Sequence, residues 1–279
     1  MRKKQQGRCI FCSGLGLSKQ HVIPNWISSL GFPSADNHNQ YVYGGKFYLG
    51  DGINSERPSV VNHWSKKHNG VLEQRKVRSV CIRCNNGWIS VVEQTAKPLI
   101  EKMIRGEQVR LEKNDCYKLA LAFVLMSILF EYTAPKPRSI IVRPSMLADI
   151  MERKEVPKGW EVGVIPLEEG DKIATRQHKN RVIADKQVLN GGYSGYLITT
   201  CLIGHLMFQT FLKIGINCTA GYAPPICREI WPNYLPSESW DSGIQRRDLK
   251  FYDVYANNIH DRMQEGDFLL LSSYTPLFW

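Results

Sequence analysis

Two Cys-x-x-Cys pairs are the residues whose spacing predicts chemistry most directly. Cys9 and Cys12 form the first pair, and Cys81 and Cys84 form the second. Two intervening residues let both sulfurs of a pair face one ion, and four thiolates complete a tetrahedral Zn²⁺ site. We therefore expect a structural zinc ion that holds this region together. A disulfide needs an oxidising compartment, and thioredoxin-like redox chemistry usually uses a single pair, so both alternatives fit less well.

The motifs that accompany the cysteine pairs are specific in combination. The first pair is followed by LSKQHVIPNW (residues 17–26), and the second opens CIRCNNGWISVVE (residues 81–93). This arrangement, which covers roughly residues 8–106, resembles the HNH nuclease family. The resemblance implies a zinc-stabilised treble-clef frame that presents a ββα-metal active site. The activity it implies is metal-dependent endonuclease cleavage, with DNA favoured over RNA as the substrate.

The resemblance also implies roles for single residues. His21, which precedes Val-Ile-Pro, is the implied general base, because a neutral imidazole can take a proton from water near pH 7. Asn85 is the implied ligand of a catalytic Mg²⁺ or Mn²⁺, with Asn86 as its adjacent rival. We further expect Glu93, two helical turns beyond Asn85 on the same helix face, to supply a carboxylate.

Two positions depart from the family pattern. Gln20 stands where the family usually has an acidic residue or a histidine, and a neutral amide is a poorer ligand for a hard cation. Lys76 occupies roughly the place of a central asparagine. Three alternatives therefore stay open: a nucleic-acid-binding protein without cleavage, a ribonuclease on the same scaffold, and a zinc module for protein–protein contacts. His21 could also be a buried histidine that supports the first cysteine pair.

The charge distribution favours a polyanionic partner. The formal net charge is +10, and residues 1–110 hold 17 Lys and Arg against 7 Asp and Glu, whereas the remainder holds 19 of each. A basic region gains affinity for phosphates by releasing counterions. A charged hairpin surface or a solubility bias would look the same in sequence. The expected nucleic-acid contacts are Lys19, Lys66, Lys67, Arg75 and Arg78.

Several elements must position these residues. The segment KVRSVC (residues 76–81) predicts a short strand, and residues 31–70 predict a loop with short hairpin strands. Residues 85–106 predict a helix with Trp88, Val91, Val92, Leu99 and Met103 inward. Residues 116–132 predict a buried helix capped by Asp115. The runs 160–167, 181–188 and 196–212 predict strands.

We expect an α+β protein with a boundary near residue 110. Residues 1–110 would form the zinc-binding, HNH-like domain, and residues 111–279 a mixed α+β domain that positions substrate, pairs two protomers or contacts a partner protein. The 43% hydrophobic and 22% charged residues are typical of globular proteins. The start of the chain lacks the pattern of a secretory signal, and the apolar run 119–130 is too short to span a bilayer. We therefore expect a cytoplasmic protein without membrane contact.

Overall fold

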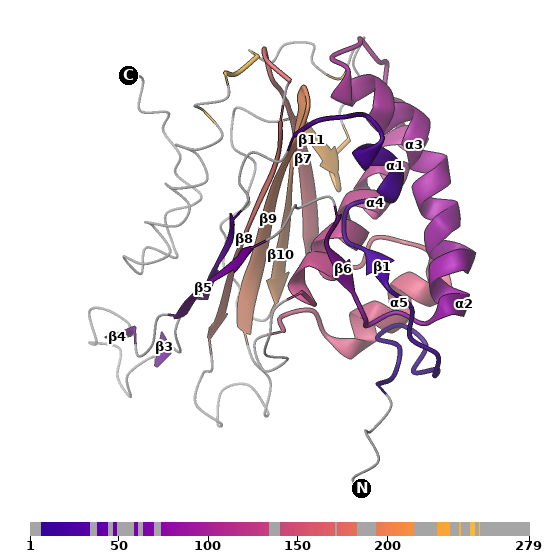
Figure 1. The fold of residues 1–279 in the computed structure, drawn as a ribbon, viewed down its shortest axis with the longest axis vertical. Coiled ribbons are helices and arrows are strands. Elements are labelled where there is room, and N and C mark those ends of the chain that lie inside the picture. The colour runs from indigo at the N-terminus through magenta and orange to yellow at the C-terminus, as the bar shows by residue number, and fades with distance from the viewer. Residues whose placement is uncertain are drawn as a thin grey trace, which may run out of the picture.

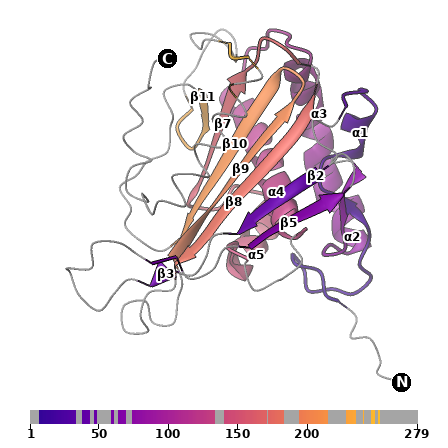
Figure 2. The same ribbon diagram turned by 60° about the vertical axis from the view of Figure 1, so that its left-hand side comes forward.

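The computed structural model describes part of the chain, with helices on one side of a large sheet (Figures 1 and 2). The described residues are 7–33, 38–43, 47–48, 59–60, 64–69, 74–133, 140–170, 172–182, 194–214, 228–234, 240, 246–248 and 251. For residues 38–43, 47–48, 59–60, 64–69, 176, 178–182 and 194–195 only the backbone is described. The architecture is mixed helix and predominantly antiparallel sheet, in agreement with the expected α+β class.

The large sheet is built mainly from the second half of the chain. Within the described ranges its strands lie in the order β11-β7-β10-β9-β8-β3-β4, and among these neighbours β3 and β8 are the parallel pair. The predicted run 196–212 is a hairpin, because the chain turns at Gly204, where φ is +56° and an added Cβ would lie 2.5 Å from the Ile104 carbonyl oxygen. Of the predicted strand 181–188, residues 181 and 182 belong to β8, and residues 183–188 lie outside the described residues. The strands are β3 (Phe47–Tyr48), β4 (Ser59–Val60), β7 (Trp160–Pro166), β8 (Ile173–Val182), β9 (Ser194–Ile203), β10 (Leu206–Ile214) and β11 (Arg228–Trp231).

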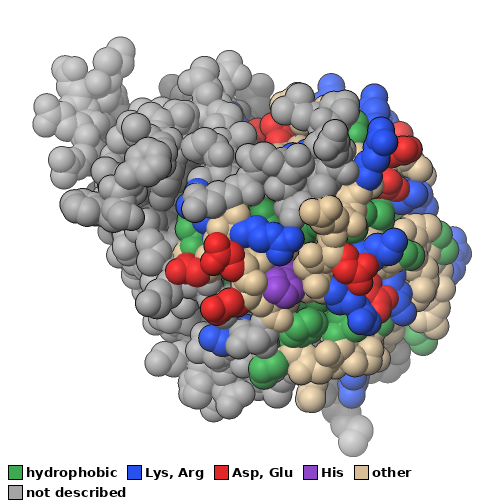
Figure 3. Space-filling view, turned by 90° about the horizontal axis from the view of Figure 1, so that it is seen from above, with side chains coloured by type: hydrophobic (Ala, Val, Ile, Leu, Met, Phe, Trp, Pro, Cys, Tyr) green, Lys and Arg blue, Asp and Glu red, His purple; other side chains and the backbone are tan. Residues whose placement is uncertain are grey.

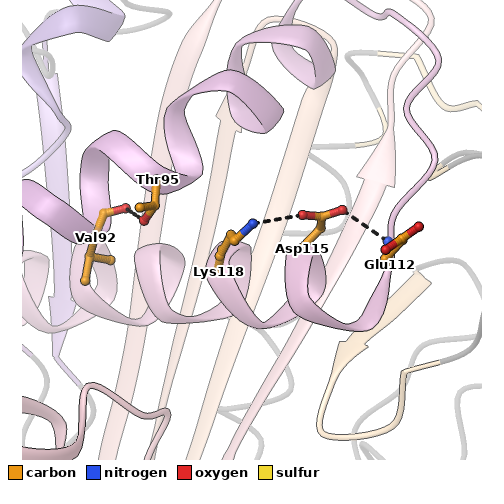
Figure 4. A network of polar contacts seen from close by, with 5 residues as sticks. All are labelled: Val92, Thr95, Glu112, Asp115 and Lys118. Atoms are coloured by element: carbon orange, nitrogen blue, oxygen red, sulfur yellow. Dashed lines mark hydrogen bonds and ion pairs between the residues drawn. The ribbon is translucent and has the colours of Figure 1, made fainter.

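Helix α4 (Lys113–Glu131) is the centre of the core and packs against the sheet. The predicted buried helix is confirmed, but its cap is not Asp115. Glu112 is the N-cap, and the Asp115 carboxylate accepts a hydrogen bond from the Glu112 amide at 3.3 Å in a reciprocal capping box (Figure 4). At the other end the buried Glu131 carboxylate accepts hydrogen bonds from the Ile141 and Val142 amides.

Helix α3 (Ser90–Ile104) begins later than the sequence predicts. The segment Asn85–Ile89 before it is kinked at Gly87, whose φ/ψ of −94° and −116° are non-helical. Val91 is 62% exposed, so its predicted inward position is wrong. The buried face instead repeats at three- and four-residue spacing through Val92, Ala96, Ile100 and Met103, which excludes position 91. Pro98 does not end the helix.

Short elements frame the cysteine pairs. Strands β1 (Gln20–His21) and β6 (Lys76–Val77) pair antiparallel. Between them in sequence, β2 (His38–Tyr43) pairs with β5 (Trp64–Asn69) and β3 with β4, also antiparallel, so the short strands expected within residues 31–70 are present. One continuous set of buried residues runs from Cys9 to Trp240. The boundary near residue 110 stays a prediction, and the core crosses that position. The remaining elements are α1 (Asn25–Ser28), α2 (Ile82–Cys84) and α5 (Pro144–Arg153).

None of the helices in the described ranges is both long enough and apolar enough to cross a membrane.

Candidate metal centre and adjoining polar pair

The four cysteines converge on one point. The sulfur atoms of Cys9, Cys12, Cys81 and Cys84 all lie within 4.8 Å of one another, and the Cys12 and Cys81 sulfurs are 3.5 Å apart. A tetrahedral zinc site with Zn–S bonds of about 2.3 Å has sulfurs about 3.8 Å apart, so this donor set fits the ion. These cysteines could therefore hold a metal ion such as zinc. Two other buried thiols, Cys116 and Cys201, lie outside the cluster.

The backbone prepares the cluster for thiolates. The Gly14 amide donates to Cys12 Sγ and the Cys84 amide donates to Cys81 Sγ, each at 3.4 Å. Such donors favour the charged sulfur and orient it. Burial by itself raises the pKa of the Cys81 thiol, but the Cys84 amide and the neighbouring thiols together lower it to about 7. Burial raises the pKa of Cys12 and of Cys84.

Aromatic contacts join the loops of the two cysteine pairs. The Trp88 ring meets Phe11 edge-on, with ring centroids 5.0 Å apart and planes at 90°. The Lys154 ammonium lies 4.9 Å from the centroid of the same indole. Trp88 is therefore a packing contact between the first cysteine pair, the turn after the second pair and the end of α5, as the sequence suggested for this residue.

Polar side chains from the β1 segment face the α3 segment. Gln20 is only 4% exposed, and its Nε2 donates to Glu93 Oε1 at 3.3 Å and to the His21 carbonyl oxygen at 3.0 Å. Its own Oε1 is buried and has no hydrogen-bond partner. Closer to the cysteines, Asn85 Nδ2 donates to Ser18 Oγ at 3.1 Å. The structure thus joins Gln20 to Glu93, and it joins Asn85 to Ser18.

Glu93 is a mostly buried carboxyl group. Desolvation by burial raises its pKa from 4.5 to about 7, and the hydrogen bond from Gln20 opposes that rise. A carboxylate and an amide oxygen in one partly dry place are ligand types that Mg²⁺ and Mn²⁺ accept. The pair could therefore contribute to a divalent cation site.

His21 is half-buried on β1, directly after Gln20. The strand register places it opposite Lys76, and the next amide, that of Val22, donates to the Arg75 carbonyl oxygen at 3.0 Å. The position that the family resemblance assigns to an asparagine is thus the cross-strand neighbour of His21. It carries an exposed ammonium group here.

The described segments around the two cysteine pairs, residues 7–33 and 74–92, carry basic side chains and no acidic ones, and we call them the zinc region. In the sequence, Glu73 directly precedes the second segment and the mostly buried Glu93 directly follows it. The end of the molecule seen in Figure 3 differs, because basic and acidic side chains are interspersed there. Six basic residues lie in the two ranges: Arg8, Lys19, Arg75, Lys76, Arg78 and Arg83.

The other predicted site residues differ in their exposure to solvent. Asn86 is exposed, whereas Asn85 is partly buried. Lys19 and Arg78 are exposed, as a phosphate contact requires. Lys66 and Lys67 lie on β5, where only the backbone is described.

Sequence reasoning missed Ser18 as the partner of Asn85, and it missed the Gln20–Glu93 bond. The only signal in the sequence was the two-residue spacing of Ser18 and Gln20 in a short extended segment.

Comparisons of the chain with protein-family models, with curated proteins and with solved structures find no match.

The raised pKa of Glu93 predicts a pH-dependent stability. The folded state binds the proton more tightly than the unfolded state, so the contribution of Glu93 to stability falls as pH rises from 4.5 to about 7 and is constant above that. We expect Glu93→Gln, which can still accept from Gln20, to gain stability relative to wild type across this window. The gain should be on the order of 3 kcal/mol.

Urea unfolding of zinc-saturated protein at a series of pH values, without Mg²⁺ or Mn²⁺, measures this difference. Subtracting wild type from variant cancels the titration of the cysteines. Glu101→Gln is the matched control, because Glu101 lies on the same helix in a surface ion pair with Arg105 at 2.8 Å. A Glu93→Gln difference that stays constant between acidic and alkaline pH would show that the carboxyl group is well solvated.

Proposed function

We propose that this protein is a zinc-stabilised, metal-dependent endonuclease of the HNH type that hydrolyses phosphodiester bonds in DNA. The observation that carries the proposal is the Gln20–Glu93 hydrogen bond beside a four-cysteine cluster. It brings the strand that holds His21 against the helix that follows the last cysteine. A contact of this kind between strand and helix supports the proposal of a ββα-metal site.

The zinc cluster supports the proposal because it ties two distant parts of the chain together. Cys12 and Cys81 are separated by 69 positions, and their sulfurs are 3.5 Å apart. Around them, Leu17 bridges to Cys81 and the Ser18 amide donates to the Val80 carbonyl oxygen at 2.8 Å. The ion would therefore fix the position of β1, and with it the position of His21.

Each proposed catalytic group has a defined task. His21 accepts a proton from the attacking water. Gln20 and Glu93, with Asn85 or Asn86, are the groups that would hold a divalent cation, Mg²⁺ or Mn²⁺. When bound, that cation offsets the negative charge that develops on the scissile phosphate. Lys76, opposite His21 on β6, adds a positive charge near the same place.

The absence of acidic residues from 7–33 and 74–92 supports a nucleic-acid substrate. Zinc would cancel half of the charge of four thiolates, which leaves these two ranges net positive. A surface of one sign attracts a polyanion and raises the rate of encounter.

Incubation of zinc-loaded protein with supercoiled plasmid DNA, in Mg²⁺ or Mn²⁺, tests the proposal. We expect nicked and then linear DNA whose new ends carry a 5′-phosphate, and no cleavage when the added cation is omitted. RNA of matched sequence distinguishes a ribonuclease. Intact DNA and RNA under every cation condition would overturn the nuclease assignment.

A second function is favoured by one observation. The Glu93 carboxyl group already accepts a hydrogen bond from the neutral Gln20 amide. Because burial also raises the pKa of Glu93, this contact can form without a bound cation. We propose as the alternative that the zinc region binds nucleic acid without cutting it. This alternative predicts that the plasmid stays uncut in the assay above, while a gel-shift measurement with the same DNA shows binding that weakens as salt rises.

A further inference from the structure

We propose that the exposed tips of the two cysteine-pair loops form an apolar wedge that enters the minor groove of a DNA duplex. The wedge consists of Leu15 and Ile82. This inference rests on the proposed function, in which the partner is a nucleic acid. It adds that the partner is a duplex and that aliphatic side chains, separate from His21, contact it.

The two side chains are unusually exposed for their type. Leu15 and Ile82 are each 57% exposed, and with Val91 they are the large hydrophobic residues that stand out on the described surface. Leu15 and Ile82 lie in the loops of the two cysteine pairs, whereas Val91 lies on α3. A single exposed aliphatic side chain is normal on a protein surface, but two at the tips of adjacent loops form a small apolar contact surface.

The backbone holds the two tips next to each other. The Ile82 amide donates to the Gly16 carbonyl oxygen at 3.0 Å, and Leu17 forms a β-bridge with Cys81. Leu15 and Ile82 thus sit at the ends of neighbouring segments. Each segment carries cysteines of the sulfur cluster, so an ion bound there would make both segments rigid, and a wedge here would enter a groove without a large loss of conformational entropy.

Arginines flank the apolar tips. Arg83 follows Ile82 directly and is exposed, and Arg8 is exposed and held to the first loop by a 3.1 Å hydrogen bond from Nη1 to the Ser13 carbonyl oxygen. Acidic residues do not occur in either described range around them. An apolar centre with a basic rim complements a groove floor between two phosphate backbones.

The chemistry of the tips favours a duplex over a single strand. Proteins that grip single strands stack bases on aromatic rings, whereas the side chains here are aliphatic. The nearby Trp88 ring is already covered by Phe11 and Lys154. Leucine and isoleucine are among the residues that wedge between base steps from the minor groove.

The test measures binding of fluorescein-labelled duplex DNA, and of the single strand of the same sequence, by anisotropy at several salt concentrations. The full zinc-loaded chain carries Leu15→Ala and Ile82→Ala together. We expect duplex affinity to fall about tenfold, with single-strand affinity and the salt dependence of binding unchanged because no charge is removed. Arg83→Gln should instead lower the slope of the salt dependence by about one.

Val91→Ala is the matched control, because it truncates an equally exposed aliphatic residue on α3, away from the two loops. It should bind like wild type. Should the double variant lose zinc, the single Leu15→Ala variant, which leaves the second cysteine pair intact, decides the question with a smaller expected loss of about threefold. Wild-type duplex affinity in the zinc-loaded variant, or an equal loss for both DNA forms, would overturn the wedge.

The outcomes separate this inference from the proposed function. If wild-type protein cuts duplex DNA and the variants bind as wild type does, the wedge is wrong and the nuclease assignment stands. If wild type binds duplex DNA with the expected variant pattern but never cuts, the wedge stands and the nuclease assignment fails. Absence of salt-dependent binding to any DNA would remove both.

Discussion

Cys81→Ala is expected to lose zinc and the folded state of the zinc region together. The four sulfurs come from two chain segments. Cys81 Sγ accepts a hydrogen bond from the Cys84 amide and lies 3.5 Å from Cys12 Sγ. Structural zinc in small domains contributes apparent binding energies of about 10–16 kcal/mol, which the apo protein cannot replace. Removing one ligand should reduce zinc content from one ion per chain to nearly none.

Metal analysis by mass spectrometry and thermal unfolding check this together. Cys116→Ala and Cys201→Ala are the controls, because both thiols are buried outside the cluster. They should keep full zinc content and lose only the modest stability expected for a small buried side chain. A Cys81→Ala protein that binds no zinc yet melts at the wild-type temperature would refute the structural role of the cluster.

His21→Ala is expected to abolish cleavage while zinc content and melting temperature stay at wild-type values. A general base contributes about 10²- to 10⁴-fold to rate, and the loss should appear in kcat more than in KM if the imidazole acts only on the attacking water. The substitution leaves the backbone hydrogen bonds of β1 in place, because the β1–β6 pairing uses main-chain groups.

Two further measurements, beside the melting temperature, distinguish a lost general base from a lost fold. Zinc content and duplex affinity should match those of wild type. The control is His205→Asn, since the His205 ring lies in the turn between β9 and β10 and its Nδ1 is 3.1 Å from the Leu167 carbonyl oxygen. That variant should still cut DNA at temperatures where it is folded. Wild-type cleavage by His21→Ala would remove His21 from the mechanism.

Local patterns in the sequence predicted much of the fold. Helix α4 and the strands around 160–167 and 196–212 appear as expected. An element that is buried on all sides has a continuous apolar sequence, and one buried on alternate sides has alternating apolar residues, so both patterns can be recognised. The errors lie at element ends. Glu112 replaced Asp115 as the cap, and Gly87 delayed the start of α3, since both depend on backbone angles that composition does not encode.

The face of α3 shows a similar limit. The sequence predicted both Val91 and Val92 inward, but two adjacent helix positions point about 100° apart, and only contact with the core decides between them. The exposure of Val91, together with that of Leu15 and Ile82, is therefore information from the structure alone.

The sequence by itself determined the metal-ligand set and the sign of the charge around it. Both are local properties: two residues between cysteines suit one ion, and a range without Asp or Glu is basic wherever it folds. Only the tertiary structure decided that Gln20 meets Glu93, that Asn85 meets Ser18 and that Lys76 lies across from His21. These partners are more than fifty residues apart, and their contact depends on strand register and on the turn before α3.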